Sequence, residues 1–291
     1  MVSFFRRLLQ MKRIGHGGTL DPGASGVLPI LVGKATRLSD YLMDYEKTYV
    51  AELTLGLATS TQDASGETTA LNTEFTVSPK RLADVLASFQ GTIWQTPPMV
   101  SAVRVGGRRL YELAREGVSV PRKPRQVQIH AINIMAIWHE QETLGFGTRV
   151  LLRVVCSKGT YIRTLCHDIG EKLGVGAHMS FLTRVKSGPL HSSQAYTLEE
   201  ITELVERGSL EFLLPMQHAL PDWVQVKVHP LVEERIKNGH FILPEHLVDV
   251  PSTLTVGDDV VLLSLDGQML ALAEIRKTDR LICQPFRVFM E

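Results

Sequence analysis

Residues 149–173 read RVLLRVVCSKGTYIRTLCHDIGEKL and contain a change of pattern that bears directly on the fold class. The first eight residues are rich in Val and Leu, which predicts a strand over 149–156. The turn SKGT follows. Apolar residues then recur at helical spacing, which predicts a helix from Tyr161 to Leu173 with a buried stripe formed by Ile162, Leu165, Ile169 and Leu173.

Outward from this stretch, strands and helices follow one another without a strict βαβ alternation. Such a mixture favours an α+β fold. Two helices carry clear start signals: Ser78 before Pro79, and Thr197 with Glu200 as a capping box. The pattern predicts helices over 3–13, 35–42, 78–91 and 197–208, and further strands over 27–33, 49–55 and 127–137.

The pattern breaks at residues 214–222, LPMQHALPD, where we expect a domain boundary. Short strand-like runs follow: VQVKV, VVLLSL, MLALAEI and LICQPFRVF. The pairs Gly257-Asp258 and Asp266-Gly267 are turn signals between them. The sequence therefore predicts a larger domain over 1–222 and a small, mainly β domain over 223–291.

The composition is that of an ordinary globular protein, with 44% hydrophobic and 21% charged residues. No apolar run approaches the ~18–20 residues that a membrane-spanning helix needs, and the N-terminus lacks signal-peptide features. The three cysteines include no CxxC pair, so neither a disulfide framework nor a metal site is expected. We expect a cytoplasmic protein with reduced thiols.

The net charge of zero hides a division along the chain. Residues 1–188 carry 23 Lys and Arg against 15 Asp and Glu, whereas residues 189–291 carry 8 against 16. The positive excess is concentrated in 101–130 and 149–188, each with seven basic and two acidic residues. A basic face on the first two-thirds of the chain suits a polyanion, although uneven charge is also common on proteins that bind none.

The glycine-rich loop GHGGTLDPGASG, residues 15–26, matches neither common phosphate-binding pattern. A Walker loop needs Lys followed by Ser or Thr, but Ala35 follows Lys34, and the dinucleotide fingerprint fails at Leu20. The loop does hold one carboxylate, Asp21, kept extended by Pro22. Asp21 could be a nucleophile or base, or simply the first residue of an Asp-Pro turn.

Arg163 is the second candidate residue. If Thr160 caps the helix, Arg163 lies in its first turn, where a cation opposes the helix dipole. It therefore either pairs with a carboxylate or phosphate, or extends into solvent. Tyr49 is a core or base-stacking residue, and His16 is a loop residue or a planar surface beside RNA. From the residues alone, Asp63 is first a turn residue and Leu182 first a core residue.

Four ordered segments together resemble the TruB family of pseudouridine synthases. They are GHGGTLDPGASGVLPILVGKAT, KTYVAELTLGLATSTQDASGE, QTPPMVSAVRVGGRRLYELAREG, and VVCSKGTYIRTLCHDIGEKLG followed by FLTR. The resemblance covers nearly all of residues 1–222. It implies a mixed, mostly antiparallel sheet flanked by helices, followed by a small β-rich PUA-like domain.

The resemblance also implies roles for single residues. Asp21 matches the family's nucleophile, Tyr49 the tyrosine that stacks on the target base, and Arg163 the arginine that pairs with the nucleophile. Asp63 matches an exchange partner of that arginine, Leu182 a pocket residue, and His16 a residue among the flipped bases. Lys158 and Tyr161, from the same motif as Arg163, are expected to bind substrate. A cation near Asp21 should lower its pKa.

The implied activity is conversion of uridine to pseudouridine in the T-loop of tRNA, at position 55. The base is flipped from its stack, and Asp21 attacks either C1′ of the ribose or the uracil ring. The partner is then the tRNA T-arm, with no cofactor, no metal, no membrane and no obligatory protein partner, and we expect a monomer.

The main alternative is a tRNA-binding or tRNA-folding chaperone in which catalysis is secondary or impaired. Family members usually begin with a strand ahead of the first helix, and we expect that strand to be missing here. Its loss would bear on stability more than on chemistry. A guide-RNA-dependent enzyme is disfavoured by the bacterial-type segment GRRLYELAREG, and a nucleotide-dependent enzyme by the failed phosphate-loop patterns.

Overall fold

The computed structural model describes residues 1–138, 143–248, 254–277 and 281–290. The chain divides into two compact units. One comprises residues 16–29 and 42–195, and the other comprises residues 1–15, 30–41 and 196–291. Among the described residues, no helix is both long and apolar enough to cross a membrane.

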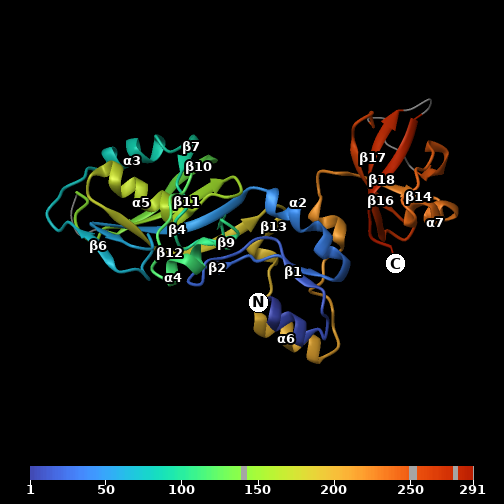
Figure 1. The fold of residues 1–291 in the computed structure, drawn as a ribbon, viewed down its shortest axis with the longest axis horizontal. Coiled ribbons are helices and arrows are strands. Elements are labelled where there is room, and N and C mark those ends of the chain that lie inside the picture. Colours follow the sequence, from blue (N-terminus) through green and yellow to red (C-terminus); the bar gives the residue numbers. More distant parts are fainter. Residues whose placement is uncertain (139–142, 249–253, 278–280, 291) are drawn as a thin grey trace. The chain divides into compact units, whose positions relative to one another are not determined.

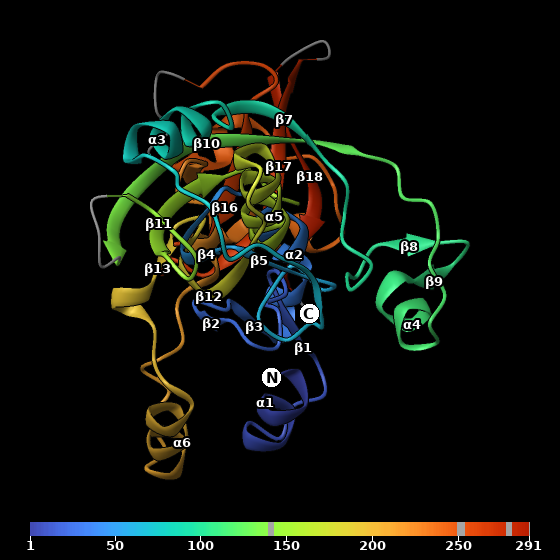
Figure 2. The same cartoon turned by 90° about the vertical axis from the view of Figure 1, so that its left-hand side faces the viewer.

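The first unit is built on one large, mostly antiparallel sheet (Figures 1 and 2). Its strand order is β13-β12-β4-β11-β10-β7, and β2 joins β12 in a parallel pair. The strands are β2 (Ser25–Gly26), β4 (Lys47–Leu55), β7 (Gly91–Gln95), β10 (Arg125–Trp138), β11 (Arg149–Cys156), β12 (Ala177–Ser187) and β13 (Leu190–His191).

The alternation along β4 shows why the sheet has a core face. Ala51, Leu53 and Leu55 are fully buried, because every second side chain points to the same side. The helices α3 (Pro79–Ala87) and α5 (Ile162–Leu173) contribute their apolar stripes to the same cluster of buried residues (Figure 1). This layer of helices on one sheet face is the α+β arrangement expected from the sequence.

Shorter elements connect these strands. They are a 3-10 helix Ser192–Gln194, the helix α4 (Leu110–Arg115), the hairpin of β5 (Leu57–Thr59) with β6 (Thr68–Leu71), and the hairpin of β8 (Arg104–Val105) with β9 (Arg108–Arg109). The hairpin of β8 and β9 runs into α4, so the first half of the basic segment 101–130 forms a hairpin and a short helix, and its last residues begin β10.

The second unit contains both ends of the chain. Its N-terminal part has α1 (Val2–Leu8), β1 (Ile14–His16), β3 (Ile30–Val32) and a 3-10 helix Gly33–Leu38 that continues into α2 (Ser39–Asp44). Phe5, Ile14 and Ile201 form a small core with α6 (Leu198–Glu206).

The C-terminal β module expected beyond residue 222 is present as a five-stranded sheet. Its order is β15-β14-β16-β17-β18, with β14 and β16 parallel. The strands are β14 (Val224–Val228), β15 (Leu247–Val248), β16 (Asp259–Leu263), β17 (Met269–Lys277) and β18 (Leu281–Val288), accompanied by α7 (Glu233–Lys237) and short 3-10 turns at Met216–Ala219, Pro230–Val232 and Pro244–His246.

The structure confirms the helix start signals and corrects several boundaries. Ser78 accepts a hydrogen bond from Arg81, and Thr197 and Glu200 form the expected capping box. The helix expected over 3–13 ends at Leu8, because Gln10 adopts a left-handed backbone conformation.

Three further expectations are wrong in detail. The strand expected over 27–33 is limited to Ile30–Val32, since Pro29 has no N–H to donate. The helix expected over 35–42 is a 3-10 turn followed by α2. The helix α3 ends at Ala87, and Gly91, expected to end it, instead begins β7.

Candidate active site

Asp21 lies in a tightly closed loop of the first unit. The Ala24 N–H donates to the Asp21 carbonyl over 2.9 Å, which closes a β-turn with Pro22 and Gly23 at its centre. Farther out, the Gly17 N–H donates to the Pro29 carbonyl over 2.9 Å. The glycine-rich stretch is therefore a closed loop that presents one carboxylate from a fixed turn.

Arg163 is the second residue of α5. Tyr161, not Thr160 as expected, precedes the helix as its N-cap, and the Thr160 hydroxyl instead donates to the Ser157 carbonyl. The Gln95 side chain fixes this helix end, since it accepts from the Tyr161 N–H over 3.0 Å and donates to the Tyr161 carbonyl over 3.1 Å. The hydrogen bonds to Gln95 thus fix the backbone next to Arg163, and the Arg163 side chain is only 4% exposed.

Arg163 contacts two carboxylates. Its Nη2 lies 3.2 Å from Asp21 Oδ1, and its Nη1 lies 3.7 Å from Asp63 Oδ2. Nη2 also donates to the Val100 carbonyl over 2.6 Å. The buried cation that opposes the helix dipole therefore has anionic partners, which is what its burial requires.

The pKa of Asp21 is raised above its ordinary value. Burial is the largest cause, Arg163 opposes it, and the charge of Asp63 adds to it. Arg163 thus acts in the expected direction, but the expectation that it would leave Asp21 with a lowered pKa is wrong, because desolvation of the carboxylate outweighs one cation.

Asp63 is held in a different way. Its Oδ1 accepts from the Thr61 hydroxyl over 2.7 Å, the Ser65 N–H over 3.0 Å and the Ser65 hydroxyl over 2.5 Å. Burial raises the pKa of Asp63, but these hydrogen bonds outweigh it and leave the pKa below its usual value. Asp63 is therefore the firmly ionised partner of Arg163, and Asp21 the partner that is easier to protonate.

Tyr49 and Leu182 lie on two neighbouring strands of the sheet in the same unit. Tyr49 lies on β4 and packs against the core cluster, and Leu182 lies on the neighbouring strand β12 and is buried in it. Burial raises the pKa of the Tyr49 hydroxyl, the Arg184 guanidinium opposes this, and the charge of Asp21 raises the pKa further. Tyr49 and Asp21 are thus close enough to interact electrostatically.

The remaining expected site residues stand in different relations to this group. Tyr161 lies beside Arg163, whose guanidinium carbon is 5.9 Å from the ring centroid. His16 ends β1, and its Nδ1 is buried with no hydrogen-bond partner in the described chain. Lys158 is exposed on the turn before α5 and pairs with Asp44 over 2.6 Å, so no contact in the structure joins it to Asp21.

Two site residues escaped the sequence analysis. Gln95 anchors the start of α5, and Arg184, on β12, is only 1% exposed. A signal for Arg184 exists in FLTRVKSG, because Leu182 and Arg184 are two residues apart and so share the inward face of a strand. Nothing local marks Gln95, whose partner is 66 residues away.

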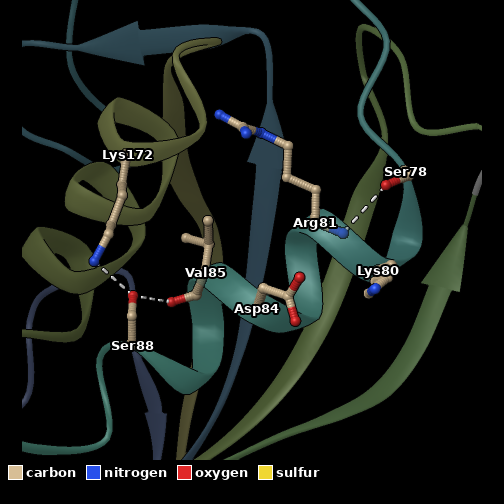
Figure 3. Close-up of a pocket in the computed structure, with 7 residues that line it drawn as sticks. All are labelled: Ser78, Lys80, Arg81, Asp84, Val85, Ser88 and Lys172. Atoms are coloured by element: carbon tan, nitrogen blue, oxygen red, sulfur yellow. Dashed lines mark hydrogen bonds between the residues drawn. The ribbon is translucent and has the colours of Figure 1, made fainter.

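A hollow on the surface of the first unit lies apart from this group. It has a volume of about 370 Å³ and is lined from α3 and α5, as Figure 3 shows, by Ser78, Lys80, Arg81, Asp84, Val85, Ser88 and Lys172. None of the residues around Asp21 lines it. Lys172 donates to the Ser88 hydroxyl over 2.6 Å, so part of its polar lining is already paired.

The arrangement around Asp21 is suited to nucleophilic chemistry. A carboxylate with 34% of its side chain exposed is held on a rigid turn beside a buried arginine, with a tyrosine and a leucine on the adjoining strands. A flat apolar base could stack there while the carboxylate attacks it. Among the described residues, no group of three or more His, Cys, Asp and Glu side chains could hold a metal ion.

The fold is similar to that of the pseudouridine synthase class. The whole chain superposes, with a TM-score of 0.72 and 27% identity, on 80% of a chain in a structure described as an H/ACA RNP bound to a substrate RNA containing 2′-deoxyuridine. A chain of a Cbf5-Nop10-Gar1 complex gives a TM-score of 0.71 at 29% identity, with 99% of this chain and 80% of that one covered.

Sequence comparison identifies the family within that class. Residues 6–162 match the N-terminal domain of TruB family pseudouridylate synthases, and residues 163–221 match the C-terminal domain of tRNA pseudouridylate synthase B. The tRNA pseudouridine synthase B of Moorella thermoacetica is 46% identical over 96% of this chain and 90% of its own length. That of Geobacillus thermodenitrificans is 40% identical over 99% and 94%. This chain belongs to the TruB family.

Proposed function

We propose that this protein converts uridine to pseudouridine in the T-loop of tRNA, at position 55, with Asp21 as the nucleophile. Membership of the family supports the isomerisation of uridine in tRNA. The observation that supports the role of Asp21 is its ion pair with buried Arg163, on a closed turn next to Tyr49.

The reaction needs no redox partner. The bond between N1 of uracil and C1′ breaks, the base turns in the pocket, and C5 bonds to C1′ while the hydrogen at C5 is replaced by one at N1. Asp21 attacks the flipped nucleotide at C1′ or at the uracil ring, and the covalent bond that it forms breaks again before the product leaves, which regenerates the carboxylate. Arg163 stabilises that carboxylate before the attack and after its regeneration. Tyr49 and Leu182 replace the stacking that the base loses when it leaves the RNA.

The other residues have supporting roles in the proposal. Asp63 holds Arg163 when Asp21 is engaged with substrate, because its own carboxylate is kept ionised by hydrogen bonds from Thr61 and Ser65. Tyr161 backs the Arg163 guanidinium. Exposed Lys158 contacts a phosphate, and His16 occupies space among the flipped T-loop bases.

The proposal includes the organisation of the chain. Residues 1–222 form the catalytic domain, and the β module from 223 to 291 is a PUA-like domain. The enzyme acts as a monomer without a protein partner in the cytoplasm. A binding-only chaperone is not favoured, because the relatives reported above are named as synthases.

The test is to incubate the purified chain alone with unmodified tRNA transcript and to map pseudouridine at single-nucleotide resolution. We expect modification at the T-loop uridine, and none with Asp21→Ala. Modification by Asp21→Ala would remove Asp21 as the nucleophile. Modification that requires an added guide RNA or protein would overturn the stand-alone part of the proposal.

A further inference from the structure

Arg184 is a buried cation that the proposed chemistry does not use. It lies on β12, is 1% exposed, and forms no ion pair with a carboxylate in the described parts of the chain. One of its nitrogens, Nη2, is buried without a hydrogen-bond partner there. A buried guanidinium is costly to desolvate. We therefore expect its other two nitrogens, Nε and Nη1, to make hydrogen bonds that an apolar side chain could not.

Those donors hold both arms of the loop that carries Asp21. Arg184 Nε donates to the Val27 carbonyl over 2.8 Å, and Nη1 donates to the Thr19 carbonyl over 3.2 Å. Thr19 precedes Asp21 by two residues, and Val27 follows it by six. One planar side chain therefore joins the entry and the exit of the loop.

The backbone of Arg184 also binds the loop. The Val27 N–H donates to the Arg184 carbonyl over 2.8 Å, and Gly26 pairs with Arg184 in the parallel ladder of β2 and β12. The two backbones approach so closely that a Cβ on Gly26 would lie 2.2 Å from the Arg184 carbonyl oxygen. The backbone of Arg184 thus holds the exit of the loop against β12, and the guanidinium of Arg184 joins the exit to the entry.

Arg184 is also the cross-strand neighbour of Tyr49. The two residues are directly paired in the antiparallel ladder of β12 and β4, so their side chains lie on the same face of the sheet. The charge of the Arg184 guanidinium acts on the Tyr49 hydroxyl and opposes the rise of its pKa. A single residue therefore holds the two arms of the loop that carries Asp21 and lies directly opposite Tyr49 on the neighbouring strand.

We infer that Arg184 is a positioning residue that sets the distance between Asp21 and Tyr49, because its guanidinium ties the Thr19 and Val27 carbonyls of the Asp21 loop to the strand position directly paired with Tyr49. This inference rests on the proposed roles of Asp21 and Tyr49. Arg184 does not touch substrate, because its free nitrogen is itself buried. Its loss therefore affects the chemical step and leaves the binding of tRNA intact.

Lysine is the informative replacement. Arg184→Lys keeps the positive charge in the same place, but a single ammonium on a flexible stem lacks the planar fork that spans two carbonyls at fixed spacing. A displacement of the nucleophile of the order of 1 Å can lower the rate about 100-fold. We expect Arg184→Lys and Arg184→Met both to lower the single-turnover rate at saturating tRNA by about this factor, with the Kd for tRNA changed less than about twofold.

The second measurement is the ionisation of Tyr49, followed by ultraviolet absorbance as the difference from Tyr49→Phe in each background. Removal of the charge in Arg184→Met should raise the pKa of Tyr49, whereas Arg184→Lys, which keeps the charge, should raise it less. Arg207→Met is the matched control, because Arg207 is an exposed arginine directly after α6 that pairs with Glu203. It should match the wild type in both measurements.

The outcomes are separable. A wild-type single-turnover rate in Arg184→Lys overturns the inference, as does a loss confined to tRNA affinity. If Arg184→Met does not fold, the lysine variant decides alone. Activity retained by Asp21→Ala would overturn the proposed function instead, whereas an inactive Asp21→Ala together with a fully active Arg184→Lys would overturn only the role of Arg184.

Discussion

At the scale of single residues, the two carboxylates that contact Arg163 differ in pKa because their surroundings differ. Asp63 accepts three hydrogen bonds at one oxygen, and Asp21 accepts its side-chain hydrogen bond from Arg163. Burial therefore leaves Asp21 with a raised pKa, whereas the hydrogen bonds to Asp63 outweigh burial and leave its pKa lowered. A nucleophile that is less stabilised as an anion is more reactive when it is ionised, and it is also easier to switch off with acid.

This difference predicts a pH shift in Asp63→Asn. Asp21 attacks as a carboxylate, so the rate falls as the pH drops through its pKa. Burial raises that pKa, and the charge of Asp63 raises it further. Asp63→Asn removes the second cause and leaves Arg163 to Asp21 alone, so the acid limb of the single-turnover pH profile should move to lower pH.

The test is the pH at which the acid limb lies, not the maximal rate, because Asp63→Asn also removes an ion pair that positions Arg163. Asp84→Asn, on the exposed side of α3, is the control and should leave the limb in place. A limb that stays where it is or moves to higher pH in Asp63→Asn would contradict the electrostatic account of Asp21.

At the scale of elements, the start of α5 is fixed from another strand. The Gln95 side chain, at the end of β7, pairs with both the N–H and the carbonyl of Tyr161 in the manner of a short β-bridge. Gln95 is 1% exposed, so these bonds are shielded from water. The position of Arg163, two residues on, depends on this pair.

We therefore expect Gln95→Leu to be costly although its volume is similar. It leaves the Tyr161 N–H without its partner and removes one of the two hydrogen bonds at the Tyr161 carbonyl, which also accepts from the Leu165 N–H. These losses should lower the free energy of unfolding by about 2 kcal/mol. Urea unfolding would measure this loss, with Gln90→Leu as an exposed control that should change stability by less than about 0.5 kcal/mol. Equal midpoints for the two variants would show that the pair contributes nothing.

The elements also show what the sequence could and could not predict. Ser78, Thr197 and Glu200 act on residues three positions away, so their caps were visible in the sequence. The early end of α1 at Leu8 was not, because the apolar spacing continues to Met11 after the backbone has turned at Gln10. Gln95 and Arg184 act over 66 and about 160 residues, and only the folded sheet brings their partners to them.

At the scale of the whole molecule, charge is divided between two parts of one chain. Residues 1–188 carry an excess of basic residues, and residues 189–291 an equal excess of acidic ones. Arg104 and Lys123 are exposed in the basic segment, and Lys227 and Lys237 are exposed in the C-terminal module. If RNA binds through the first part, equal losses of charge in the two parts should have unequal effects.

Salt dependence measures this difference directly. Each phosphate contact releases counterions, so the logarithm of tRNA affinity falls with the logarithm of salt concentration, and the slope decreases by about one for each contact removed. We expect the double variant Arg104→Gln with Lys123→Gln to have a shallower slope than the wild type, with an unchanged single-turnover rate at saturating tRNA. The matched double variant Lys227→Gln with Lys237→Gln should retain the wild-type slope. A shallower slope in the second pair alone would place the principal phosphate contacts on the acidic module, and the charge division would then not mark the RNA-binding face.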